Sequence, residues 1–259
     1  MSARIDVNGA TLAYDERGSG APLVLLHGGL SSGAVWEPVA TRLAGEFWVI
    51  TPDSRGHGSS TNSGATLSYA LLADDVAAFS CALDLHKPVV AGWSDGGQIA
   101  MELAVRRPEV AGALIIGGAY PDFVHSGLHE AHRDLLANLK VHLGDEAEEI
   151  KALHDDWDEL VKQSAAMWLG YEGLSGEEIS KITTPVLVLA GDRDELVGLD
   201  LSIALYRTFV EAELAICPAA SHESPMTNER AAVFAAMIGD FCRRHDTRQV
   251  AADPAPEVA

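Results

Sequence analysis

Basic residues, aromatic residues and cysteines are all scarce in this chain of 259 residues. Eighteen lysines and arginines stand against 38 acidic residues, which gives a formal net charge of −20. A surface of that sign repels nucleic acids and anionic membranes over a Debye length. We therefore expect neither as a partner, and a small molecule as the ligand.

The three cysteines, Cys81, Cys217 and Cys242, are far apart in the sequence and match no metal-binding spacing. An odd number cannot all pair, so we expect no disulfide framework. No run of eighteen apolar residues occurs, and Met1–Asp6 lacks the apolar core of a signal peptide. These absences predict a soluble cytoplasmic protein, either a monomer or a homodimer.

Short apolar runs alternate with amphipathic stretches along most of the chain. The expected strands are residues 11–16, 23–26, 47–51, 89–92, 113–116, 185–191 and 212–216, and the main expected helices are 68–83, 97–107, 199–209 and 228–241. Buried strands separated by helices predict an α/β fold in which helices cover both faces of a mostly parallel sheet.

This alternation stops between residues 120 and 181. The segment has no convincing strand, has helical patterns over 128–143 and 146–169, and is strongly acidic. We expect a helical cap at 120–181, inserted into a core formed by residues 1–119 and 182–245. Residues 246–259, rich in alanine and proline, are expected to be a disordered tail.

A serine stands at the junction of an expected strand and an expected helix, in the pentapeptide Gly92-Trp93-Ser94-Asp95-Gly96. Glycines two residues before and after Ser94 allow a tight turn in which the serine adopts a strained backbone. This context predicts a nucleophile elbow, with the serine hydroxyl at the positive end of a helix.

A serine nucleophile needs a base, and the base needs a carboxylate that fixes its tautomer. His222 follows the last expected strand, and Asp194 follows the strand before it. Asp194 lies farther along its loop than Asp192, which is the reserve candidate. The prediction depends on the Ser94 hydroxyl meeting the His222 imidazole. Backbone N–H groups of Gly29 and Asp95 are the expected oxyanion donors.

These motifs together resemble the α/β-hydrolase superfamily, from about Thr11 to Phe241. The likeness rests on the ordered series His27-Gly28-Gly29, the DxRGxGxS segment at residues 53–59, the elbow, Asp194 and His222. The elbow is similar to that of valacyclovir hydrolase (biphenyl hydrolase-like) proteins, and the wider set includes meta-cleavage product hydrolases, lactonases and small esterases. A serine nucleophile argues against haloalkane dehalogenases and epoxide hydrolases, which use aspartate. The sequence departs from the family's pattern at Ser221, just before His222, where relatives often carry glycine.

Substrate contacts are expected from Leu30, Trp93, Asp95 and Trp168. Asp95 has two interpretations: it stabilises the helix N-terminus, or it attracts a cationic group of the substrate. Trp168, with Trp157, Met167 and Tyr171, belongs to the expected apolar underside of the cap.

Several histidines and one arginine have less direct interpretations. His27 is expected to order its own loop, and Arg55 and His57 to brace the loop below the site rather than contact substrate. His125, His129 and His132 share one helical face and form either a metal site or, as we favour, an exposed polar surface.

The sequence therefore predicts a serine hydrolase that needs no cofactor or metal and cleaves a small carboxylic ester, such as an amino-acid ester, through an acyl-enzyme. The alternatives are a carbon–carbon bond hydrolase or lactonase with the same residues, and a slow-turnover ligand receptor on the same scaffold.

Overall fold

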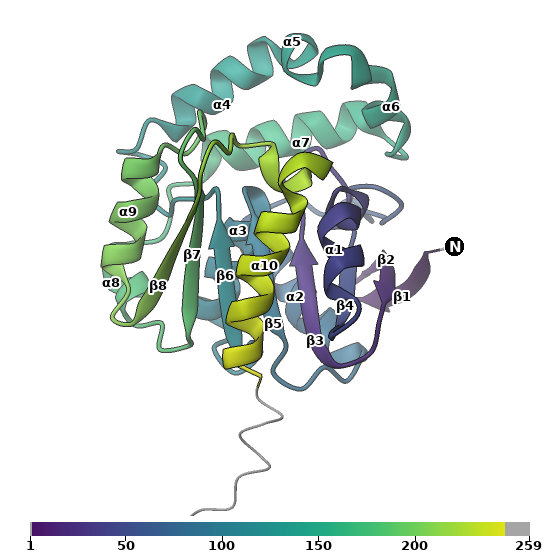
Figure 1. Cartoon of the computed structure of the whole chain (residues 1–259). Helices are drawn as coiled ribbons and strands as arrows, with labels where there is room; N and C mark the ends of the chain where they lie inside the picture. Colours follow the sequence, from purple (N-terminus) through teal and green to yellow (C-terminus); the bar gives the residue numbers. More distant parts are fainter. Residues whose placement is uncertain (1, 247–259) are drawn as a thin grey trace, which may run out of the picture.

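A single eight-stranded sheet forms the centre of the computed structural model, which describes residues 2–246 (Figure 1). Its order is β1-β2-β4-β3-β5-β6-β7-β8, and only the β1–β2 and β2–β4 pairs are antiparallel. The strands are β1 (Ala3–Val7), β2 (Ala10–Arg17), β3 (Ala21–Leu26), β4 (Phe47–Pro52), β5 (Val89–Trp93), β6 (Ala113–Gly117), β7 (Val186–Gly191) and β8 (Ala212–Cys217). The predicted α/β fold with a mostly parallel sheet is confirmed.

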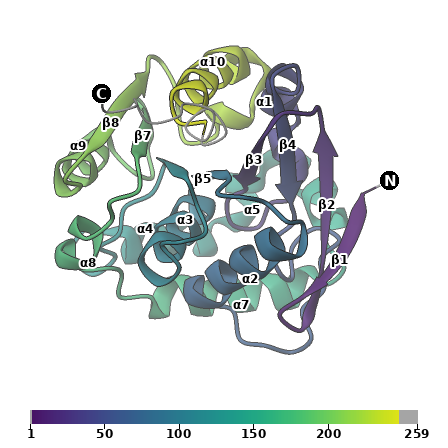
Figure 2. The same ribbon diagram turned by 90° about the horizontal axis from the view of Figure 1, so that it is seen from below.

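Helices cover both faces of this sheet, as Figure 2 shows. On one face lie α1 (Glu37–Leu43) and α10 (Asn228–Arg244), and on the other lie α2 (Tyr69–Ala82), α3 (Asp95–Arg106) and α9 (Leu199–Thr208). Side chains of β3 alternate between the two cores: Leu23 and Leu25 pack with α1 and α10, while Val24 and Leu26 pack with α2 and α3. Both faces are apolar, which explains the continuous hydrophobic runs of the parallel strands.

Five α-helices lie between β6 and β7, and four of them extend across the carboxyl end of the sheet (Figure 1). They are α4 (Leu128–Ala137), α5 (Leu139–Leu143), α6 (Ala147–Ala152), α7 (Trp157–Gly170) and α8 (Gly176–Ser180). We call α4 to α7 the helical layer. The continuous helix expected over 146–169 is wrong, because the chain breaks after α6 and Asp156 caps α7 by accepting a hydrogen bond from the Glu159 amide.

No helix within residues 2–246 is both long and apolar enough to cross a bilayer. The expected disordered tail lies outside the described residues, apart from Asp246. The short 3₁₀ turns are Gly33–Trp36, Gly144–Glu146 and Ser224–Met226.

Candidate active site

The chain turns sharply between β5 and α3, and Ser94 stands at the apex. Its backbone has φ 56° and ψ −120°, a conformation that non-glycine residues rarely adopt. A side chain at Gly92 would collide with the Gly96 carbonyl, and one at Gly96 with the Leu26 carbonyl. The two glycines therefore allow the turn to close, and the Ser94 amide is fixed by donating to the Gly117 carbonyl at 2.9 Å.

His222 and Asp194 meet at the carboxyl ends of β7 and β8. His222 Nδ1 lies 3.0 and 2.9 Å from the two carboxylate oxygens of Asp194, and both residues are buried. The Asp194 carboxylate also accepts the amides of Leu196 and Val197, which fixes its orientation. Asp192, the reserve candidate, instead accepts the Ala220 amide at 3.2 Å.

The charge of Asp194 controls the protonation of His222. Burial is the largest single influence and disfavours the imidazolium. The Asp194 hydrogen bond and charge, helped by the charges of Glu223 and Glu195, outweigh it and raise the pKa of His222. The imidazole is thereby prepared to hold a proton taken from a nucleophile.

The expected contact between the Ser94 hydroxyl and His222 is not made in this state. Within residues 2–246, the hydroxyl forms no hydrogen bond at 3.5 Å or less. The two residues are nevertheless linked through Trp93, whose indole Nε1 donates to the His222 carbonyl at 2.9 Å. Catalytic hydrogen bonds of this kind are often formed only when substrate is bound.

The His27-Gly28-Gly29 turn lies beside Ser94. A Cβ atom at Gly28 would be 3.2 Å from Ser94 Cβ, and one at Gly29 would collide with the Trp168 ring and lie 2.6 Å from Asp95 Oδ2. Only glycine fits at position 29 without displacing either neighbour. The backbone of Gly29 is thus close to the two residues expected to complete the oxyanion hole and the pocket wall. Leu30, which follows, is buried with φ 54°.

Asp95 is buried and bonded by side chains from two other helices. Its carboxylate accepts the Tyr69 hydroxyl at 2.6 Å and the Trp168 indole at 2.8 and 3.0 Å. Burial raises the pKa of Asp95, although these hydrogen bonds and the nearby His132 oppose that shift. Asp95 therefore ties α2 and α7 to the start of α3, a role that neither sequence interpretation included.

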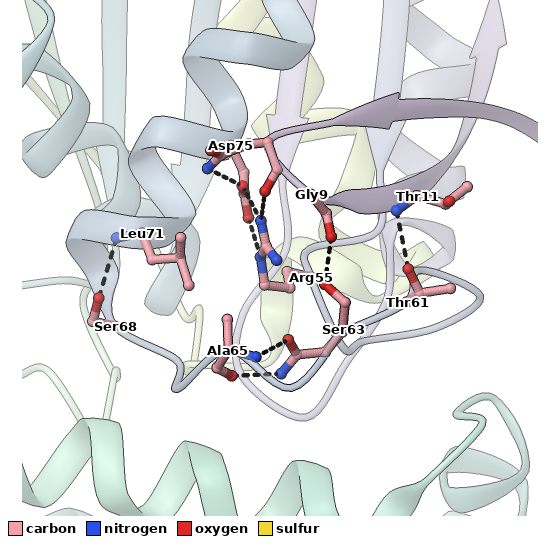
Figure 3. A network of polar contacts seen from close by, with 11 residues as sticks. Gly9, Thr11, Arg55, Thr61, Ser63, Ala65, Ser68, Leu71 and Asp75 are labelled. Atoms are coloured by element: carbon pink, nitrogen blue, oxygen red, sulfur yellow. Dashed lines mark hydrogen bonds and ion pairs between the residues drawn. The ribbon is translucent and has the colours of Figure 1, made fainter.

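The loop below the site is braced by buried polar contacts. Arg55 makes a buried ion pair with Asp75, with N–O distances of 2.6 and 2.7 Å (Figure 3). His27 Nε2 accepts the Ser54 amide at 2.9 Å, and burial lowers the pKa of His27 to about 4. Burial likewise lowers the pKa of His57 to about 3, and His57 Nδ1 faces the Arg55 carbonyl.

His154, between α6 and α7, connects the helical layer to this loop and was missed by the sequence analysis. Its Nδ1 accepts the Gly58 amide at 2.9 Å, and its Nε2 lies 3.3 Å from the Leu30 carbonyl. Nothing in its local sequence marks it, because the contact joins residues that are 96 and 124 positions apart.

The three histidines at 125, 129 and 132 do not share one environment. His125 pairs with Asp122 and is exposed, His129 contacts the Tyr171 carbonyl, and His132 is buried. The exposed surface expected for all three is therefore wrong for His132. No group of three metal-ligating side chains is present in the described range.

A cavity of about 10 Å³ separates Ser94, Asp95 and Gln98 from Leu128 and His132 of α4. That volume holds about one water molecule. Gln98 was missed as a site residue, and His132 was considered only as a metal ligand or a surface residue, although the spacing of both was informative. Gln98 lies one helical turn after Ser94, and His132 shares an apolar stripe with Leu128 and Leu136.

Residues 23–237 match the Alpha/beta hydrolase family. The chain belongs to this family. The hydrolase is 28% identical over 262 residues to 2-hydroxymuconate semialdehyde hydrolase of Pseudomonas sp. strain CF600, covering 91% of each protein.

Two solved structures share the hydrolase's fold. An esterase from Thermogutta terrifontis is 22% identical with a TM-score of 0.79, over 95% of this chain and 99% of that one. The meta-cleavage product hydrolase of Pseudomonas fluorescens IP01 is 21% identical with a TM-score of 0.78, over 93% and 97%. The predicted superfamily resemblance is confirmed.

Proposed function

We propose that this hydrolase cleaves small carboxylic esters through an acyl-enzyme on Ser94. The observation that carries the proposal is the pairing of a serine in a strained turn with a buried His222–Asp194 couple linked to it through Trp93. Ester hydrolysis by a serine nucleophile requires a serine, a histidine and a carboxylate, and it needs no cofactor.

In the first half of the reaction, Ser94 Oγ attacks the ester carbonyl carbon while His222 Nε2 takes its proton. Asp194 holds the Nδ1–H tautomer and stabilises the imidazolium. The backbone N–H groups of Gly29 and Asp95 stabilise the negative oxygen of the tetrahedral intermediate. His222 then gives the proton to the departing alkoxide, which leaves as an alcohol.

In the second half, a water molecule gives a proton to His222 and attacks the acyl-serine carbonyl. Collapse of the second tetrahedral intermediate breaks the bond to Ser94 Oγ, and the serine regains its proton from His222. The products are a carboxylic acid and the resting enzyme. Because the cavity has room for about one water molecule, side chains that line it must move to admit an ester.

The first test is hydrolysis of p-nitrophenyl acetate and butyrate by the wild type and Ser94→Ala. We expect a burst and steady release of p-nitrophenol, and a loss of kcat on the order of 10⁴-fold or more in the variant, since it lacks the nucleophile. Ser221→Ala is a matched control that leaves the nucleophile in place. Equal rates in wild type and Ser94→Ala would refute the proposal, and tight binding with negligible turnover would favour a receptor.

The second candidate is carbon–carbon bond hydrolysis with the same residues. The specific observation in its favour is the 28% identity to 2-hydroxymuconate semialdehyde hydrolase over 91% of both chains. Assaying 2-hydroxymuconate semialdehyde beside the p-nitrophenyl esters separates the two. A kcat/KM that is at least tenfold higher for the semialdehyde would replace the ester proposal.

A further inference from the structure

Two polar side chains outside the proposed catalytic residues line the cavity at Ser94. Gln98 is on α3, one turn after the nucleophile, and His132 faces it from α4. They are 2% and 5% exposed, so each needs a partner inside the protein or on a ligand.

The amide of Gln98 has a fixed orientation. Its Nε2 donates to the Tyr120 carbonyl at 2.6 Å, and the opposite orientation would place two oxygens against each other. The oxygen Oε1 must therefore face away from Tyr120. In the described part of the chain, this buried Oε1 has no hydrogen-bond partner. An unpaired buried acceptor is destabilising, so a ligand that donates a hydrogen bond to Oε1 removes an unfavourable feature of the site.

His132 also presents an acceptor. Its Nδ1 lies 2.7 Å from the Leu128 carbonyl, and a carbonyl can only accept, so Nδ1 carries the hydrogen. Burial lowers the pKa of His132, which leaves Nε2 with a free lone pair near neutral pH. The ring is held between Phe123, stacked at 5.4 Å, and Trp168 at 4.9 Å.

Asp95 also lines the cavity, but its carboxylate already accepts hydrogen bonds from Tyr69 and Trp168. Gln98 and His132 therefore give this cavity two rigid acceptors whose donors are still to be supplied. They come from two helices, α3 and α4, that line the same cavity, so one group bound there can contact both.

We propose that Gln98 and His132 determine specificity by sharing, in one three-centre hydrogen bond, the single hydrogen that a substrate hydroxyl group a few bonds from the scissile carbonyl donates. This inference rests on the proposed function, because it assumes that the carbonyl is attacked by Ser94. Neither residue moves a proton in the reaction. A substrate without the hydroxyl leaves both acceptors unpaired and is disfavoured for that reason.

The test uses two matched ester pairs, in which a methyl ether keeps the oxygen and removes the donor. The acyl pair is ethyl 3-hydroxybutyrate and ethyl 3-methoxybutyrate. The alcohol pair is 2-hydroxyethyl butyrate and 2-methoxyethyl butyrate. Acid release by the wild type is expected to favour the hydroxyl member of one pair by about 100-fold in kcat/KM. A ratio near one in both pairs, with hydrolysis intact, would overturn the inference and leave the proposed function standing.

Two variants assign the preference to these side chains. Gln98→Met removes the acceptor at similar size, and His132→Asn keeps a donor for the Leu128 carbonyl while removing Nε2. Each is expected to lower the hydroxyl preference about tenfold. The matched control His125→Asn changes an exposed histidine outside the cavity and should leave the ratio unchanged.

Binding provides a readout that does not need turnover. In Ser94→Ala, calorimetric titration should show the same hydroxyl preference in Kd, and Gln98→Met in that background should reduce it. If no ester is hydrolysed but the Kd preference is present, the proposed function fails and the binding inference survives. Equal Kd values for the hydroxyl and methoxy members of both pairs would overturn it.

Discussion

At the residue scale, the active site depends on the protonation of one imidazole. In the proposed mechanism His222 must be neutral to accept the Ser94 proton. Its pKa is raised because the Asp194 hydrogen bond and charge, with the charges of Glu223 and Glu195, outweigh the effect of burial. Activity is therefore present above that raised pKa and is lost as the pH falls through it. We expect kcat/KM for p-nitrophenyl butyrate to decline below a midpoint higher than the ordinary value of 6.5.

The variant Asp194→Asn tests the cause of this raised pKa, because it keeps an oxygen for the Leu196 and Val197 amides and removes the charge. The midpoint should move to lower pH, because the two largest influences that raise it are gone, and kcat should fall on the order of 10⁴-fold. Asp192→Asn, on the same loop but bonded to Ala220, is the control. A midpoint unmoved in Asp194→Asn would mean that another carboxylate orients His222.

At the scale of elements, α7 is attached to the active site by one indole. Trp168→Phe keeps the aromatic packing against His132 but removes both hydrogen bonds to the buried Asp95 carboxylate. We expect a loss of about 1.5–3 kcal/mol, because hydrogen bonds to charged groups contribute that much. Amide hydrogen exchange should accelerate in α7 more than in α3.

Trp48→Phe serves as the comparison, since that indole, on strand β4, bonds the Glu16 carboxylate of β2 at an exposed site. Its effect on stability should be less than 1 kcal/mol, roughly the value for an exposed interaction. Similar losses of stability in both variants would show that the Asp95 contact does not hold α7.

The helices and strands also show which features of the fold can be predicted from the sequence and which cannot. Strands β5 and β6 were predicted to within one residue, because both faces are buried and their apolar runs are continuous. Strand β1 was not predicted, since it is an edge strand that alternates partly buried and exposed residues. The break between α6 and α7 was also missed, although the capping residue Asp156 is visible in the sequence.

The candidate site also contains contacts that can be predicted from the sequence and contacts that cannot. Ser94, Asp194 and His222 stand at strand ends, whose common edge brings distant residues together, so their proximity follows from topology. The pairing of Asp95 with Tyr69 and Trp168 depends on how α2 and α7 pack over α3. No local pattern encodes that packing, so these contacts and their consequences come from the structure.

At the scale of the whole molecule, buried neutral histidines make folding sensitive to acid. The pKa values of His27 and His57 are lowered to about 4 and about 3, mainly by burial. Between those values and about 6.5 the unfolded chain binds protons that the folded chain does not, so stability falls as pH falls. Each histidine should lower the free energy of unfolding by roughly 2 kcal/mol between pH 7 and pH 5.

Urea unfolding of wild type and His57→Gln at the two pH values measures this effect. The variant should be less stable at pH 7 but should lose less stability on acidification. His86→Gln is the control, because His86 has 88% of its side chain exposed. An identical pH dependence in wild type and His57→Gln would contradict the assignment.

The smallness of the cavity beside Ser94 has a kinetic consequence. A space that admits about one water molecule does not admit an ester, an alcohol or an acid unless the residues around it move. If Ser94 hydrolyses esters as proposed, each cycle includes such movements, and they limit turnover where they are slower than the chemistry. Raising solvent viscosity slows movements of this kind and not proton transfer, so the dependence of kcat on viscosity measures them.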